Sequence, residues 1–259
     1  MHSLFMLFGI LAELRRRGHS AEVISGVSDR IEADAAVLHV DATIVPPEYL
    51  DFASRFPFCL NIGATDISKR RVSSALVSAK DDWDGPVIVK SNFNARGMPE
   101  FCMNGRARKR GRRPPFPNAR VLPEYIVHER LADVPREIFE RPDLVVEKFM
   151  PERAGDGFAA CFWIFCGESE RCTRYVSRDP LVKGARVVRS EPMRVPDELR
   201  VRRRELGFDY GKFDFVMHDG RAVLLDANKT PGGSPNLASA IAAGTASLAD
   251  GFEGLIRRS

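Results

Sequence analysis

The sequence contains no apolar run long enough to cross a membrane. The longest run near the N-terminus, residues 4–12, is too short, and no basic segment precedes it as in a secretory signal. Its leucines recur at helical spacing, so we expect a buried amphipathic helix over residues 4–17. With 44% hydrophobic and 29% charged residues, the composition is that of a soluble globular protein without a membrane partner.

Several common catalytic and metal-binding patterns are also missing. The five cysteines form no Cys-x-x-Cys pair and have no metal-type spacing with histidine. An odd cysteine count without a signal predicts reduced thiols and a cytoplasmic location. The five histidines are scattered, and none lies near a nucleophile as a Ser-His-Asp hydrolase requires. No Gly-x-Gly-x-x-Gly turn occurs, so we expect no independent dinucleotide site.

The net charge of +4 arises from one basic segment. Seven cations and no acid lie between Gly105 and Arg120, and without them the net charge would be −3. Three prolines within residues 114–117 add to the expectation of a mobile or extended insertion over residues 104–120. A solvated insertion is one interpretation, and docking of an acidic partner or nucleic acid is the other. No aromatic residue interleaves the charges of residues 106–113, so base stacking has little support. The cations are Arg106, Arg108, Lys109, Arg110, Arg112, Arg113 and Arg120.

Alternating short helices and strands predict a small α/β layer over residues 1–64, and residues 65–259 form a second, larger domain. We expect strands over residues 21–24, 35–40, 58–61, 86–90, 144–151 and 158–165, and helices over residues 46–56, 66–78 and 196–206.

The most informative stretch is residues 210–228, which predict two apolar strands joined by a His-Asp-Gly turn. Asp226 and Asn228 share a strand face, and the hairpin can bring Asp214 beside them. Three oxygen-bearing side chains suit a hard cation such as Mg²⁺. A plain hairpin with solubilising acids is the alternative. The polar, Gly/Pro-rich loop 229–236 and the small-residue helix 237–243 favour a site mouth.

Three further features have ordinary explanations when each is taken alone. Lys90 ends a buried strand before a polar loop, and Lys69 begins a helix. Glu147 and Lys148 precede an extended, apolar backbone that could offer main-chain groups to an adenine edge. Lysines at strand ends commonly extend to solvent, and neighbouring strand residues point to opposite faces.

The order of these features resembles the ATP-grasp superfamily of carboxylate–amine and carboxylate–thiol ligases. The resemblance covers about residues 61–236 and is most specific at residues 211–214 (Gly-Lys-Phe-Asp) and 225–232 (Leu-Asp-Ala-Asn-Lys-Thr-Pro-Gly). It implies an α+β fold in which two α+β lobes clasp ATP, with residues 65–259 as the ATP-grasp domain behind the small α/β layer. It also implies a set of site residues. Lys69 and Lys90 would contact the phosphates, and Lys212 would act with Lys90 on the transferred phosphate. The adenine would be bound by Glu147, Lys148, Phe149 and Met150, and the ribose by Asp156. Mg²⁺ would be held by Asp214, Asp226 and Asn228.

The chain departs from the family pattern in several respects, and two of them concern the metal ligands and the loop after Lys90. Asp226 stands where glutamate is usual, and the loop after Lys90 has a single glycine, Gly97, in place of several. The implied activity is an ATP- and Mg²⁺-dependent ligase that activates a small carboxylate as an acylphosphate for attack by an amine or similar nucleophile. A nucleotide-binding regulatory protein and a small-molecule kinase are the alternatives. In the basic stretch before the hairpin, Arg174 and Arg186 are candidates for binding the substrate carboxylate. A solvated edge strand is the other interpretation of this stretch.

Overall fold

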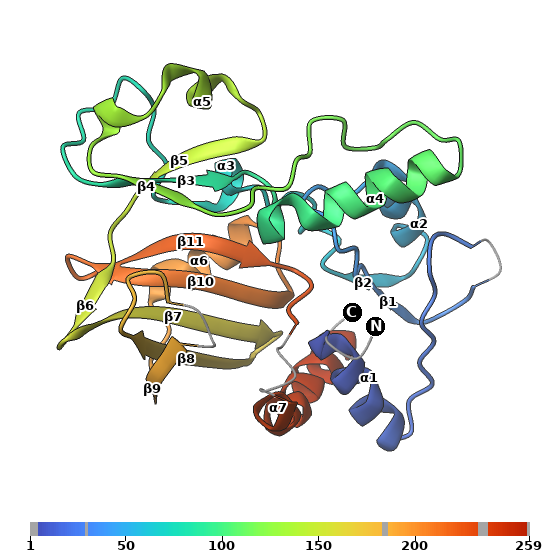
Figure 1. Cartoon of the computed structure of the whole chain (residues 1–259). Helices are drawn as coiled ribbons and strands as arrows, with labels where there is room; N and C mark the ends of the chain where they lie inside the picture. Colours follow the sequence, from blue (N-terminus) through green and yellow to red (C-terminus); the bar gives the residue numbers. More distant parts are fainter. Residues whose placement is uncertain (1–4, 29–30, 183–185, 233–237, 258–259) are drawn as a thin grey trace.

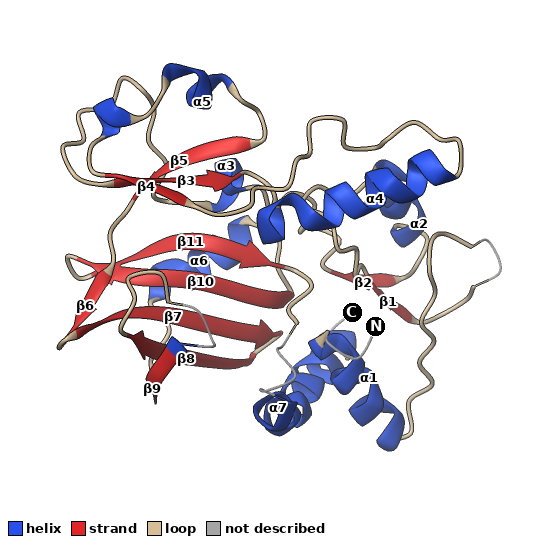
Figure 2. Ribbon diagram, viewed as in Figure 1, coloured by secondary structure: helices blue, strands red, loops and turns tan. Residues whose placement is uncertain are grey.

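The computed structural model describes residues 5–28, 31–182, 186–232 and 238–257, with the side chains of 238–243 left out. Two antiparallel sheets of different size and a two-stranded parallel pair carry the strands, with helices around them (Figures 1 and 2). This mixed architecture agrees with the predicted α+β class. No helix in the described part of the chain is both long and apolar enough to span a membrane.

The large sheet has the strand order β11-β10-β7-β8-β9, and the short strand β6 also pairs with β7. Alternation along β7 separates its two faces, because Trp163 and Phe165 are fully buried while Phe162 and Ile164 are half-buried. The buried face packs on α6 and forms the main core, and the other face carries the polar side chains described below. The elements are β6 (Glu152–Ala154), β7 (Gly157–Cys166), β8 (Ser169–Ser177), β9 (Val187–Pro192), α6 (Asp197–Glu205), β10 (Tyr210–His218) and β11 (Arg221–Asn228).

The small sheet has the order β4-β3-β5 and lies beyond β11 in Figure 1. Val87 and Val89 on β3 and Val146 on β5 join an apolar cluster on its outer face. Lys90 and Glu147 therefore point from the opposite face, since strand residues alternate. The elements are β3 (Val87–Ser91), β4 (Ile126–His128), η3 (Leu131–Asp133), α5 (Arg136–Glu140) and β5 (Leu144–Lys148).

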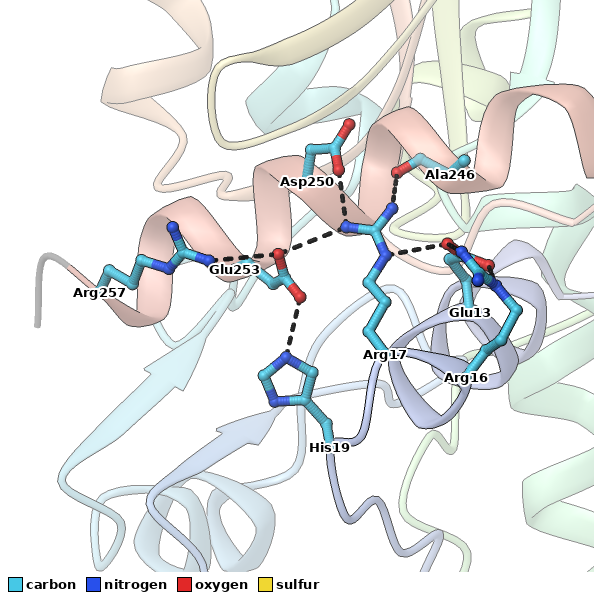
Figure 3. A network of polar contacts seen from close by, with 8 residues as sticks. All are labelled: Glu13, Arg16, Arg17, His19, Ala246, Asp250, Glu253 and Arg257. Atoms are coloured by element: carbon cyan, nitrogen blue, oxygen red, sulfur yellow. Dashed lines mark hydrogen bonds and ion pairs between the residues drawn. The ribbon is translucent and has the colours of Figure 1, made fainter.

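The N-terminal elements pack against the C-terminal helix and against the end of the large sheet. The parallel pair consists of β1 (Ala35–Val37) and β2 (Phe58–Leu60), which are connected through α2 (Pro47–Ala53). Leu60 of β2 joins the apolar cluster between α1 (Met6–Arg16) and α7 (Ala238–Ile256). Figure 3 shows the polar contacts that join the two helices. Arg17 contacts the carboxylates of Asp250 at 2.6 Å and Glu253 at 3.3 Å. The boundary at residue 64 stays a prediction.

One predicted element does not form, and several others are shorter than predicted. Residues 21–24 form no strand, and the predicted helix over residues 66–78 is reduced to α3 (Lys69–Val72). Backbone bonds from the following residues explain the early end, because Ser74 N–H donates to Leu224 O at 2.8 Å and Val77 N–H to Val146 O at 3.0 Å. Residues 73–77 thus bond to strands of both sheets, which a helix could not do.

The prediction of a mobile or extended insertion over residues 104–120 is wrong for its first part. After a turn at η2 (Asn94–Gly97), helix α4 runs from Met98 to Lys109 and includes three of the seven cations. Two fully buried side chains fix it. Glu100 accepts the Thr43 N–H, and Asn104 exchanges hydrogen bonds of 2.6 and 3.0 Å with the Phe116 backbone. These tertiary bonds outweigh the polar composition from which disorder was inferred.

Candidate functional site

The predicted hairpin forms, and its register brings the candidate ligands together. Asp219 and Gly220 at the turn have φ values of 49° and 76°, as a two-residue hairpin turn with right-handed strand twist requires. Asp214 on β10 lies directly opposite Asp226 on β11, and Lys212 lies opposite Asn228. Directly opposed residues share a sheet face, so all four side chains emerge on one side.

Lys212 and Asp214 are joined on this face by an ion pair of 2.9 Å. The Lys212 ammonium also lies 4.6 Å from the centre of the Phe162 ring on the neighbouring strand β7. Burial raises the pKa of Asp214, and the Lys212 charge opposes this rise. Lys212, two residues before Asp214, is thus placed to neutralise it.

Lys69 reaches the same hairpin from α3. Its Nζ lies 3.0 Å from Asp226 Oδ1, and its side chain is only 3% exposed. Burial alone would lower the pKa of Lys69, but Asp226, Tyr125 and Glu147 together raise it above the usual value. The backbone of α3 is held in place as well, because Lys69 N–H donates to Asn92 O at 3.1 Å.

Lys90 and Glu147 form the third pair, on the inner face of the small sheet. The distance between Lys90 Nζ and Glu147 Oε2 is 2.6 Å, and Glu147 is fully buried. The other oxygen, Oε1, has no hydrogen-bond partner among the described residues. A buried carboxylate oxygen without a partner costs free energy unless a ligand supplies a donor.

Tyr125 is a member of this group that sequence reasoning missed. Its ring centre lies 5.9 Å from Lys90 Nζ. Burial raises the pKa of its phenol; the charge of Lys69 acts to lower this pKa, and the carboxylates of Asp226 and Glu147 act to raise it. The signal was available, because Tyr125 begins a run of Tyr-Ile-Val-His, which is typical of a strand.

The predicted adenine-binding segment follows Glu147. Its main-chain donors are partly used within the protein, since Lys148 N–H donates to Ala75 O at 2.7 Å and Phe149 N–H to Pro86 O at 2.9 Å. The Lys148 ammonium lies 4.6 Å from the Trp83 ring centre. Met150 lies just beyond β5, and Asp156 is exposed in the turn between β6 and β7. The roles of these residues stay predictions.

The structure does not bring Arg174 and Arg186 to the hairpin face. Arg174 lies opposite Cys161, on the core face of the sheet, and contacts Glu152 and Glu191 at 2.7 Å each. Arg186 is exposed and pairs with Asp179 at 3.0 Å. Because side chains alternate along a strand, Arg174 points to the face of the sheet opposite the one that carries the candidate site residues. Lys183, which lies in the same basic stretch, is outside the described residues. So are residues 233–236 of the predicted site-mouth loop and Leu237, the first residue of the helix predicted after it.

The predicted ligands offer the oxygen atoms that a hard cation prefers, but only two of them are carboxylates. In the described ranges, no group of three or more histidine, cysteine, aspartate or glutamate side chains is arranged so that it could hold a metal ion. The predicted set has two carboxylates and one amide, and the amide oxygen of Asn228 accepts the Thr230 N–H at 2.8 Å. Carboxylate and amide oxygens are suitable Mg²⁺ ligands together with phosphates and water. The magnesium site stays a prediction.

Comparisons with known proteins identify the fold. No protein-family model and no curated protein matches the chain. Solved structures do match. A RimK domain ATP-grasp protein from Sphaerobacter thermophilus DSM 20745 aligns with a TM-score of 0.54 and 12% identity over 96% of this chain and 95% of that one. The ATP-grasp ligase PsnB, in a complex with Mg, ADP and a phosphomimetic variant of its minimal precursor, aligns with a TM-score of 0.55 and 12% identity over 96% and 94%.

Proposed function

We propose that this chain, which has the ATP-grasp fold, is an ATP-dependent ligase that activates a carboxylate as an acylphosphate for capture by an amine. The observation that supports this proposal most directly is the convergence of three lysine–carboxylate pairs from separate elements. They are Lys69–Asp226, Lys90–Glu147 and Lys212–Asp214. PsnB, which has the same fold, is by name an ATP-grasp ligase, and its complex contains Mg and ADP.

The paired charges suit a nucleotide and a cation that bind together. Lysine ammonium groups bind phosphate oxygens, and the carboxylates that now neutralise them would then be available to a cation. Asp214, Asp226 and Asn228 would hold Mg²⁺, which when bound neutralises phosphate charge during transfer. The partnerless Glu147 Oε1 fits a donor such as the amino group of adenine. The residues present therefore fit ATP and Mg²⁺.

The chain's own residues would act by positioning and charge stabilisation. An oxygen of the substrate carboxylate attacks the γ-phosphorus of ATP, the bond to the β-phosphate oxygen breaks, and ADP leaves. An amine then attacks the acyl carbon, and inorganic phosphate leaves as the amide forms and a proton is released. Lys212 and Lys90 offer fixed positive charge to the transferring phosphoryl group, which needs electrostatic support more than covalent catalysis.

Thermal unfolding with and without ATP and Mg²⁺ tests nucleotide binding. We expect Mg-ATP to raise the Tm of the wild-type chain, and Asp214→Asn and Asn228→Ala to lose most of this increase. Asp219→Asn is the matched control, because Asp219 is 91% exposed at the hairpin turn. Full stabilisation of both site variants would show that these residues do not hold the metal.

Turnover separates ligase from the two alternatives. A ligase releases ADP and phosphate only when a carboxylate and an amine are both present, so a screen of amino acids and small carboxylates is the decisive assay. Stable phosphorylated product without phosphate release would identify a kinase. Nucleotide binding without ADP release under any acceptor would identify a regulatory protein.

A further inference from the structure

Helix α4 carries an exposed strip that is apolar at one end and cationic at the other. Met98 and Phe101 are 44% and 52% exposed and lie one helical turn apart. Arg106, Arg108 and Lys109 follow and are exposed, and at about 100° per residue all five side chains fall within roughly half of the helix circumference. We call these five residues the α4 strip.

The cations of the strip have no acidic partners within the described ranges. No ion pair or side-chain hydrogen bond is recorded for Arg106, Arg108 or Lys109, nor for Arg110, Arg112 and Arg113 just beyond the helix. Arginines elsewhere in the described chain do form ion pairs, as Arg174 and Arg200 show. Basic residues at a helix C-terminus offset the helix dipole, but this effect is limited to the last turn. It does not account for cations that continue to Arg113.

The support beneath the strip is rigid. Glu100 and Asn104 on the opposite face of α4 are 0% and 2% exposed and bond to the backbone of Thr43 and Phe116. The strip is therefore presented in a fixed geometry, which lowers the entropic cost of binding. Gly105, in the middle of the strip, has no atom within 4 Å of the position a Cβ would take. Glycine weakens a helix interior by about 1 kcal/mol, and no packing contact here requires it.

We propose that the α4 strip docks an acidic peptide segment that has an apolar residue at one end. Charge complementarity selects acids, and the apolar end selects a peptide over a plain polyanion. From Phe101 to Lys109 the helix rises roughly 12 Å, which an extended peptide spans in about four residues. The bound segment would thus place acids three to five residues from its apolar anchor. Nucleic acid is the less suitable occupant, because the one aromatic side chain of the strip, Phe101, lies at its apolar end and none lies between the cations of residues 106–113, where successive bases would stack.

Docking on the strip does not depend on the proposed ligase activity, and α4 begins where the loop after Lys90 ends. In Figure 1 the helix extends from near the end of β11 toward the outside of the molecule.

The test measures binding of fluorescein-labelled octapeptides by fluorescence anisotropy. The probes carry a Phe-Leu pair at one end and glutamates at the other, in both chain directions, and a third probe has glutamine in place of glutamate. We expect one acidic probe to bind, with affinity that falls as salt rises, and the glutamine probe to bind at least about tenfold more weakly. Equal binding of acidic and glutamine probes would overturn the proposal.

Variants locate the surface. The triple change Arg106→Glu, Arg108→Glu and Lys109→Glu should weaken acidic-probe binding about tenfold or more, and Phe101→Ala should weaken it several-fold. The matched control makes the same charge change at three exposed cations away from the strip: Lys80→Glu, Arg136→Glu and Arg204→Glu. Equal loss in the control triple would show a net-charge effect and contradict the proposal, as would unchanged binding in Phe101→Ala.

Two further measurements keep the result clear. A single-stranded RNA of matched charge serves as competitor, and tighter binding of the RNA that is lost in the strip variants would assign the surface to nucleic acid and refute the peptide proposal. The glutamine triple Arg106→Gln, Arg108→Gln and Lys109→Gln guards against misfolding, and its weakened binding with an unchanged Tm would support the proposal. Because Mg-ATP stabilisation should persist in all strip variants, failure here is distinguishable from failure of the proposed function.

Discussion

The ion pair between Lys69 and Asp226 predicts an asymmetric response to mutation. The Lys69 side chain is 3% exposed, whereas that of Asp226 is 29% exposed. In Asp226→Asn the ammonium of Lys69 stays buried without its partner and cannot regain water. In Lys69→Met the carboxylate of Asp226 keeps access to solvent. Removing the acid should therefore destabilise the protein more than removing the base.

The magnitudes follow from burial. Breaking a fully buried pair costs about 3–5 kcal/mol. Relief of the repulsion between Asp226 and Asp214, which lie directly opposite each other, reduces this to about 2–3 kcal/mol for Asp226→Asn. Loss of a partner from a solvated carboxylate costs about 1 kcal/mol, which is our expectation for Lys69→Met. For a domain of this size, each kcal/mol lowers Tm by roughly 2–4 °C.

Urea unfolding of the two single variants and the double variant, in the absence of nucleotide, is the assay. The double variant should be more stable than the sum of the single costs predicts, with a coupling of about 1–2 kcal/mol. Asp219→Asn at the exposed turn should leave the midpoint unchanged. Simple additivity, or a larger loss in Lys69→Met than in Asp226→Asn, would refute the ion pair as the structure shows it.

Three further predictions concern separate parts of the fold. Lys90→Met should cost about 3–5 kcal/mol in urea unfolding, because it leaves the carboxylate of Glu147 fully buried and unpaired, while the double variant with Glu147→Gln should recover part of the loss. Burial lowers the pKa of His39 from its usual 6.5 to about 4, so the unfolded state binds the proton first as pH falls. Stability should drop by about 2 kcal/mol between pH 7 and pH 5 from this group, and a His39→Phe variant with the same pH dependence would contradict it. Gly251→Ala should be strongly destabilising, because a Cβ there would collide with a backbone carbonyl of β7, whereas Gly254→Ala on the same helix meets no atom within 4 Å and should be neutral or stabilising in a thermal melt.

The hairpin shows how far local pattern reaches. Strand alternation and the Asp-Gly turn set both strands and the shared face of Asp226 and Asn228, because these properties depend only on neighbouring residues. The register that puts Asp214 opposite Asp226 does not follow from the turn alone, because the pairing of the two strands shifts by one residue between Asp214 and Phe215. The likeness to the ATP-grasp fold, inferred from the order of motifs, is confirmed by the solved structures.

Long-range packing decided what local pattern could not. The local pattern predicts a helix through residues 73–77, but their backbone bonds to strands of both sheets. The composition of the basic segment predicts a mobile insertion, but the segment begins within a helix that Glu100 holds in place. In each case the deciding bonds join residues far apart in sequence, so no local window contains them.

The sequence by itself determined the central hairpin, the candidate ligands and the order in which they occur, since periodicity and turn chemistry are local properties. Only the tertiary structure decided the pairing of charges. Lys69 lies 157 positions from Asp226 and Lys90 lies 57 from Glu147, and their partnerships exist because the packing of the sheets removes these side chains from water. Burial makes each unpaired charge costly, and this cost selects the partners.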